Sequence, residues 1–82
     1  MAKTFHLTVA RVGENLFDGD ALSATVPGVE GVFTILAGHE SLVSPLKIGT
    51  LKIVDGEGAV HEIPLEVPGV AEVSSNQATV LL

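Results

Sequence analysis

The sequence contains no cysteine, tryptophan or tyrosine, and it has only three phenylalanines. The absence of cysteine excludes a disulfide framework and any metal site built on thiolates. The shortage of aromatic side chains also disfavours a small-molecule pocket, because such pockets are usually lined by aromatic residues. A chain of 82 residues is long enough for one domain with one small hydrophobic core, so we treat residues 1–82 as a single domain.

Positive charge is also scarce, since four Lys and Arg residues stand against ten Asp and Glu residues and give a formal net charge of −6. Nucleic-acid binding depends on cations that neutralise phosphates, so we expect no nucleic-acid partner. No apolar run approaches the length of a membrane span, and residues 1–6 lack the apolar stretch of a secretory leader. We therefore expect no direct membrane insertion. A mean hydropathy of +0.51 is high for so small and acidic a chain, and it indicates apolar surface that meets a partner.

Apolar and polar residues alternate along most of the chain, which is the pattern of a half-buried β-strand. In the first such run, Phe5, Leu7 and Val9 alternate with polar neighbours. The predicted strands are residues 4–9, 21–26, 32–36, 51–54, 59–67, 70–73 and 78–82. No helix-length amphipathic segment separates them, and short connections favour antiparallel neighbours. The pattern therefore predicts an all-β fold, a small flattened antiparallel β-sandwich.

The phase of the alternation predicts which side chains point into the core. Each predicted core residue occupies the apolar phase of its run. These residues are Phe5, Leu7, Val9, Leu22, Val26, Leu51, Ile53 and Val80.

Clusters of Gly, Asn and Asp mark the turns between the predicted strands. We expect hairpin turns at Asp18-Gly19, at residues 55–58 and at Ser75-Asn76. Two near copies of Val-Pro-Gly-Val, at residues 26–29 and 67–70, carry the Pro-Gly pair that a type II turn prefers. Residues 37–47 show no clear alternation, so they are the best candidate for a functional loop.

No motif in the sequence predicts catalysis, cofactor binding or metal binding. The three histidines, His6, His39 and His61, have no spacing that would make them one metal site. We interpret His6 and His61 as solvated strand positions. The stretch His39-Glu40-Ser41 has the residue types of a hydrolase triad, but adjacent residues in one short segment rarely form one, so we interpret it as a polar loop. The glycines on either side of Glu57 lack the third glycine and the helix of a dinucleotide site.

Several segments, in order and without gaps, resemble the amino-terminal domain of the F-type ATP synthase epsilon subunit. They are Phe17-Asp18-Gly19, Val26-Pro27-Gly28-Val29-Glu30-Gly31, Phe33-Thr34-Ile35-Leu36-Ala37-Gly38-His39 and Leu46-Lys47-Ile48-Gly49-Thr50-Leu51-Lys52-Ile53. Residues 3–9 resemble that family's first strand and residues 71–81 its last two, so the resemblance covers essentially the whole chain. The most specific element is Pro-Gly-x-Glu-Gly followed at this distance by Gly-His.

The resemblance implies a flattened sandwich of about ten short strands in the rotating central stalk of the ATP synthase. There the domain would sit on the gamma subunit and touch the polar loops of the c-ring. The expected c-ring contacts are Glu30, Gly31, Val32, Gly38, His39 and Glu40. The expected gamma contacts are Arg11, Leu42, Val43, Ser44 and Leu46. The family supplies the c-ring positions except Glu40, which we add for its charge, and it supplies Arg11 and Ser44, to which we add three apolar residues near Ser44.

We therefore expect a non-catalytic coupling subunit that holds gamma and the c-ring in a fixed relation during ion-driven ATP synthesis. It would be a peripheral protein at the cytoplasmic face of the energy-transducing membrane, without a cofactor. The family's chain usually continues into two carboxy-terminal helices that inhibit hydrolysis and in some members bind ATP, so we expect this chain to do neither. The alternative is a free-standing β-sandwich module that binds a small ligand or a protein. An enzyme is the least supported class.

Overall fold

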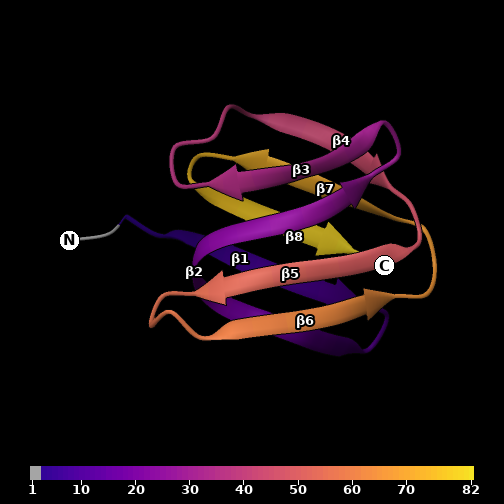
Figure 1. Cartoon of the computed structure of the whole chain (residues 1–82), viewed down its shortest axis with the longest axis horizontal. Coiled ribbons are helices and arrows are strands. Elements are labelled where there is room, and N and C mark those ends of the chain that lie inside the picture. The colour runs from indigo at the N-terminus through magenta and orange to yellow at the C-terminus, as the bar shows by residue number, and fades with distance from the viewer. Residues whose placement is uncertain (1–2) are drawn as a thin grey trace.

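The computed structural model describes residues 3–82, whose regular elements are all β-strands (Figure 1). They are β1 (Phe5–Arg11), β2 (Glu14–Gly28), β3 (Gly31–Leu36), β4 (Leu42–Leu46), β5 (Gly49–Asp55), β6 (Val60–Leu65), β7 (Gly69–Ser74) and β8 (Gln77–Leu81). The predicted all-β fold is confirmed, but residues 3–82 form eight strands rather than about ten. One reason is β2, a continuous strand of 15 residues that runs through the turn expected at Asp18-Gly19.

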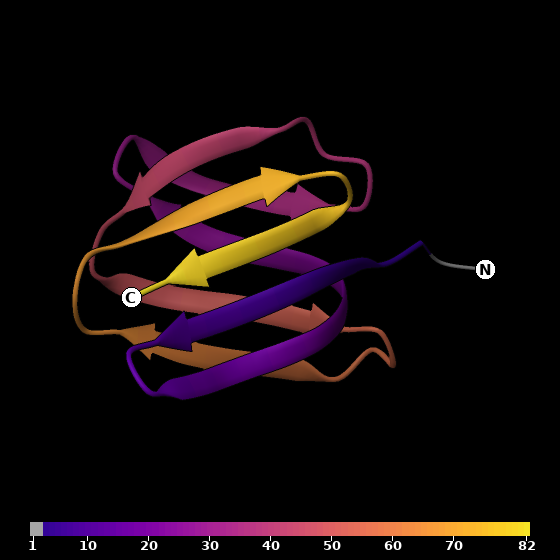
Figure 2. The same cartoon turned by 180° about the vertical axis from the view of Figure 1, so that it is seen from behind.

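The strand β2 is long enough to belong to both layers of the sandwich. Its first part pairs with β1, from Arg11 opposite Glu14 to Phe5 opposite Ala21. Its second part pairs with β3 on one edge and with β5 on the other. We call β3, the second part of β2, β5 and β6 the front layer, which faces the viewer in Figure 1. The back layer is β4, β7, β8, β1 and the first part of β2, and Figure 2 shows it from behind.

The strands β1 and β8 pair in parallel, whereas we expected antiparallel pairing throughout. Parallel neighbours need a long connection, and here the connection is the whole chain between the first strand and the last. The remaining pairs are antiparallel, so the prediction holds for most of the fold. The parallel pair also ties the two ends of the chain together in the middle of the back layer.

Two of the three predicted hairpin turns are confirmed. Residues 56–59 join β5 to β6, and Ser75-Asn76 join β7 to β8 with positive φ angles of 51° and 60°, as a type I′ turn requires. The third prediction is wrong, because Asp18 and Gly19 lie inside β2 and pair with β1. The chain instead reverses at Val12-Gly13, where Gly13 takes the left-handed conformation with a φ of 76°.

The two Val-Pro-Gly-Val segments do not form type II turns. Gly28 ends β2 and Gly69 begins β7, and neither has a positive φ. Each glycine is instead needed where two backbones approach closely. A Cβ added to Gly28 would lie 2.7 Å from the carbonyl oxygen of Gly31, and one added to Gly69 would lie 2.5 Å from that of Leu81. These Pro-Gly pairs therefore allow close packing of strands and do not reverse the chain.

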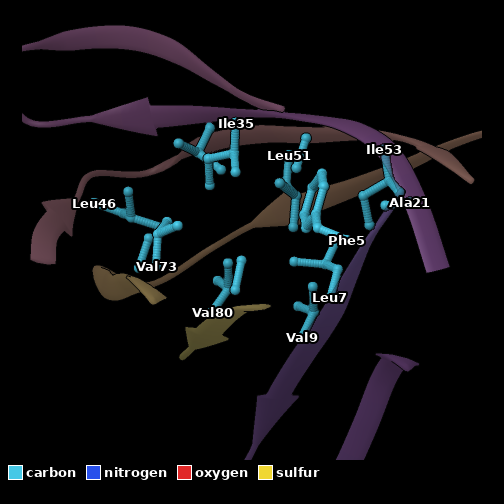
Figure 3. Close-up of a cluster of buried hydrophobic side chains, with 14 of the residues drawn as sticks. Phe5, Leu7, Val9, Ala21, Ile35, Leu46, Leu51, Ile53, Val73 and Val80 are labelled. Atoms are coloured by element: carbon cyan, nitrogen blue, oxygen red, sulfur yellow. The ribbon is translucent and has the colours of Figure 1, made fainter. Parts of the chain in front are cut away.

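The core lies between the two layers, and within residues 3–82 its buried side chains are all apolar (Figure 3). Predicted core residues that are buried are Phe5, Leu7, Val9, Val26, Leu51, Ile53 and Val80. Leu22 is the exception, because it is only partly buried. A β-bulge between Ala21 and Ser23 adds one residue to β2, so that Ala21 and Ala24 are the buried neighbours on either side of Leu22.

The segment predicted as a functional loop, residues 37–47, is a loop only in part. Residues 42–46 form β4, which pairs with β7 from Leu42 opposite Val73 to Leu46 opposite Gly69. The alternation is hidden because an inward-phase position of β4 holds Ser44 while two exposed positions hold Val43 and Pro45. Within residues 3–82, no helix is long and apolar enough to cross a membrane.

Candidate functional site

The expected c-ring contacts lie at opposite ends of the sandwich. Glu30 is in the turn between β2 and β3, whereas His39 and Glu40 are in the connection between β3 and β4. The six residues of β3 separate these two connections. At about 3.3 Å per residue, the distance between them along the strand is roughly 20 Å. Figure 1 shows the two connections at the right and left ends of the longest axis, along which the Cα trace extends 35 Å. The residues expected to contact the c-ring therefore do not form one surface.

The first end, which we call the β2–β3 end, carries aliphatic side chains at the tips of its loops. Strand register places residues 12–13, 29–30, 47–48 and 66–68 together at this end. Each of these four loops presents one exposed aliphatic side chain, and these are Val12, Val29, Ile48 and Val67. Glu30 is exposed beside them, and Arg11 forms an ion pair with Glu14, with Nη2 2.8 Å from Oε1. The sequence analysis missed these aliphatic tips. Val29 and Val67 stood in predicted Pro-Gly turns, which was a signal for them, whereas Val12 and Ile48 lay outside every predicted turn.

The opposite end, which we call the β3–β4 end, is polar and is held in place by Asn76. The Gly38 N–H donates to Asn76 Oδ1 at 3.0 Å, and Asn76 Nδ2 donates to the carbonyl oxygen of Thr4 at 2.8 Å. The His6 N–H donates to the Asn76 carbonyl at 3.2 Å. One side chain in the β7–β8 turn thus fixes the connection that carries His39 relative to the start of β1. Sequence analysis identified Asn76 only as a turn residue.

The histidine in this connection is not arranged for catalysis. The His39 Nδ1 atom lies 2.8 Å from the backbone carbonyl oxygen of Glu40, and the backbone N–H of His39 donates to the carbonyl oxygen of Leu36 at 3.1 Å. The ring of His39 is therefore bonded to a backbone carbonyl and not to a carboxylate that would orient a general base. The interpretation of residues 39–41 as a polar loop agrees with this geometry.

The expected gamma contacts fall on the back layer, but one of them is not on the surface. Leu46 is only 1% exposed and packs in the core, so its side chain is not available for a surface contact. Val43 is exposed and lies opposite Glu72 of β7, while Leu42 and Ser44 are partly buried. Arg11 is at the end of β1, which belongs to the same layer but is separated from β4 by the two strands β7 and β8. The back layer is therefore the face that presents the gamma candidates.

Two histidines interact with aspartates, which the interpretation as solvated strand positions did not anticipate. His61 Nε2 lies 2.7 Å from Asp55 Oδ2, and the ring of His61 packs edge-on against Phe17. The hydrogen bond from His61 lowers the pKa of Asp55 below its ordinary value, and the backbone N–H groups of Ala59 and Glu57, which donate to Asp55 Oδ1, lower it further.

The second histidine–aspartate pair joins β1 to β2. His6 Nε2 lies 2.7 Å from Asp18 Oδ1, which also accepts a hydrogen bond from Thr8 Oγ1. The register that puts Thr8 opposite Asp18 is the signal for this pair, and it was hidden because Asp18 was assigned to a turn. No cluster of three or more His, Asp or Glu side chains within residues 3–82 could hold a metal ion.

The sequence and the fold match a known family. The model of the ATP synthase delta/epsilon chain β-sandwich domain matches residues 4–82. The chain belongs to this family. The ATP synthase epsilon chain of Afipia carboxidovorans is 40% identical to it over 78 residues, which are 95% of this chain and 56% of that protein. The ATP synthase epsilon chain 1 of Nitrobacter hamburgensis is 41% identical over 78 residues, with the same coverage of 95% and 56%.

Solved structures share the fold of this delta/epsilon-chain domain. A chain in the Euglena gracilis mitochondrial ATP synthase, in a structure of OSCP, F1 and the c-ring, superposes with a TM-score of 0.87 at 25% identity. That match covers 95% of this chain and 49% of the other. A chain in the central stalk and c-ring structure of the Tetrahymena thermophila mitochondrial ATP synthase superposes with a TM-score of 0.76 at 17% identity. That match covers 96% of this chain and 63% of the other. The chain spans a little over half the length of the two bacterial relatives.

Proposed function

We propose that this chain is a non-catalytic central-stalk component of an F-type ATP synthase that couples rotation of the gamma subunit to the c-ring. The observation that carries the proposal is the family match over residues 4–82. The two mitochondrial structures named above are of assemblies that contain a c-ring, and one of them is of a central stalk. In this role the protein is peripheral to the energy-transducing membrane, on its cytoplasmic face, and acts through contacts alone.

The architecture supports a mechanical role. A part that transmits torque must resist deformation, and a close-packed apolar core has low compressibility. Here the two layers share β2, and the parallel pair of β1 and β8 ties the chain ends together. A load applied at one end of the sandwich is therefore carried to the other by continuous hydrogen-bonded strands.

We assign the c-ring contact to the β2–β3 end alone. The flat top of a ring can meet only one end of a body 35 Å long, so Glu30 and His39 cannot both touch it when the long axis points at the ring. Glu30, Gly31 and Val32 remain as ring candidates, and the exposed tips Val29 and Ile48 add apolar contact beside them. Salt would screen the part of this contact that depends on Glu30 and leave the apolar part.

We assign the residues Gly38, His39 and Glu40 to the gamma side instead. Their connection leads directly into β4, whose Val43 is exposed on the back layer, so the two segments form one continuous surface. Arg11 marks the far end of this surface on β1. In this arrangement the two partners meet different elements, with gamma along the back layer and the ring at one end.

Co-purification of the tagged chain with gamma and the c-ring tests the proposal. Glu30→Lys should weaken retention of the ring and leave gamma retained, while Val43→Asp should weaken retention of gamma. Glu57→Lys is the matched control, because Glu57 is an exposed glutamate in the connection between the front-layer strands β5 and β6, which carries neither proposed contact, and it should affect neither partner. A wild-type chain that retains neither gamma nor ring would contradict the proposal and favour a free-standing binding module.

A further inference from the structure

The outer edge of β3 carries unpaired backbone groups without the features that usually protect an exposed strand. Within residues 3–82, β3 pairs only with β2, so its other edge is open. The six residues of β3 include no charge and no proline. The other free edges are protected in ordinary ways, by Glu62 and Pro64 in β6, by Pro45 in β4, and by Glu14, Asp18 and Asp20 in the first part of β2.

The front layer also ends one strand short of the back layer at this edge. Among the described residues, 3–82, the front layer has no strand beyond β3, whereas the back layer continues to β4, which lies behind and above β3 in Figure 1. Leu42 of β4 and Phe33 of β3 pack against the core but are only partly buried. Leu42 is in the inward phase of β4 but keeps part of its surface exposed at this edge of the sandwich.

The charges around the edge of β3 indicate what kind of extended segment could bind there. Glu30 directly precedes β3, and Glu40 lies in the connection that leaves its other end, so an uncharged edge has a carboxylate near each end. Along the edge, Val32 is 67% exposed and Leu36 is 55% exposed. An extended segment with aliphatic residues in its middle and a lysine or arginine at each end matches this arrangement.

We infer that the outer edge of β3 is a docking site for an extended, aliphatic, basic-ended segment of another protein, which adds to the front layer as a further strand. Backbone hydrogen bonds supply the binding, and Val32, Leu36 and Leu42 supply apolar contact. A second copy of this chain is a poorer occupant, because two molecules of net charge −6 repel each other. This inference does not depend on the ATP synthase role.

Amide hydrogen exchange, measured by NMR on the 82-residue chain, tests the inference. The probe is a synthetic peptide that alternates valine and threonine over the length of β3 and carries a lysine at each end. With peptide at about ten times its dissociation constant, exchange at alternate amides of β3 should slow about tenfold. The free edge of β6 is the internal control and should not change. The same peptide with N-methyl groups on alternate residues keeps its side chains and charges but should give no protection, because it cannot form the backbone hydrogen bonds.

A matched pair of variants adds a second test. Val32→Lys should weaken peptide binding about two- to fivefold, because it replaces an aliphatic cross-strand contact with a charge that repels the peptide's lysine. Val60→Lys changes a valine of similar exposure, 58% against 67%, on the edge strand β6, and should leave binding unchanged. Equal protection by the N-methylated peptide, protection of β6 in place of β3, no protection at all, or self-association of the chain through β3 in sedimentation experiments would each overturn the inference.

Discussion

Leu51 lies in the centre of the core, and its replacement by alanine measures how strongly the two layers are held together. The side chain is 0% exposed and sits in β5 of the front layer. Removing a fully buried leucine side chain costs about 2–5 kcal/mol, because the lost apolar burial and the cavity left behind add together. A folded chain of 82 residues is typically stable by about 4–12 kcal/mol in total. Leu51→Ala should therefore remove a large share of the free energy of unfolding.

Leu22→Ala provides the comparison that makes this prediction specific. Leu22 sits at the bulge in β2 and is only partly buried, so its removal opens no closed cavity. We expect a loss of about 1 kcal/mol, which is the part of its burial that the change removes. Leu36→Ala is the surface control, because that side chain is 55% exposed on β3 and should cost less than about 0.5 kcal/mol.

Urea denaturation followed by far-ultraviolet circular dichroism is the suitable assay, because the chain has no tryptophan or tyrosine for fluorescence. In thermal denaturation followed by the same signal, each kcal/mol lost should lower the Tm by about 4–8 °C for a domain of this size. Equal losses at Leu51 and Leu22 would show that the bulge does not turn Leu22 out of the core. An unchanged midpoint for Leu51→Ala would refute the assignment of β5 to the front layer with this face inward.

Three further changes test other parts of the structure. Gly28→Ala should destabilise the fold by about 1–3 kcal/mol, because the added Cβ meets the Gly31 carbonyl oxygen at 2.7 Å, whereas Gly19→Ala, with no atom within 4 Å, should cost little in the same urea titration. Asn76→Gly keeps the positive φ of 60° but removes the side-chain bonds to Gly38 and Thr4, so amide exchange at Gly38 should speed up while the fold is kept; unchanged exchange would argue against the tether. The pKa of Asp55 is lower in the folded chain than in the unfolded chain, so its pairing with His61 stabilises the fold at pH values above the unfolded-state pKa of about 3.9. This stabilisation is lost as the pH falls through the lower folded-state pKa. The stability gap between wild type and Asp55→Asn should accordingly shrink below about pH 4, and a gap that is constant with pH would contradict the pairing.

The fold could be predicted largely from local patterns. Alternation with period two identified most strands and seven core positions, because each strand buries one face and the pattern records which one. The bulge at Leu22 was missed because an extra residue reverses the phase without any change in residue type. The turn at Asp18-Gly19 was misplaced because the alternative turn at Val12-Gly13 leaves the same residues free to continue a strand.

The candidate surfaces were harder to predict, because they depend on where strand ends meet in space. Glu30 and His39 are close in sequence, but one strand of extended backbone carries them to opposite ends of the sandwich. Leu46 was expected to be a surface contact because it is an apolar residue in a segment that shows no clear alternation. Its position at the end of β4, opposite Gly28 and Gly69, instead places it in the core. The tether from Asn76 to Gly38 joins residues 38 positions apart, and no local pattern records such a contact.

Cysteine crosslinking within an assembled ATP synthase tests the central claim most directly, because the chain has no cysteine of its own. Glu30→Cys and Glu40→Cys place one reactive thiol at the β2–β3 end and one at the β3–β4 end, both at exposed positions. With a short photoactivatable crosslinker on the thiol, position 30 should join to the c-ring and position 40 to gamma. Crosslinks from both positions to the same subunit, or to neither, would contradict a central-stalk domain that meets the ring at one end and gamma along the back layer.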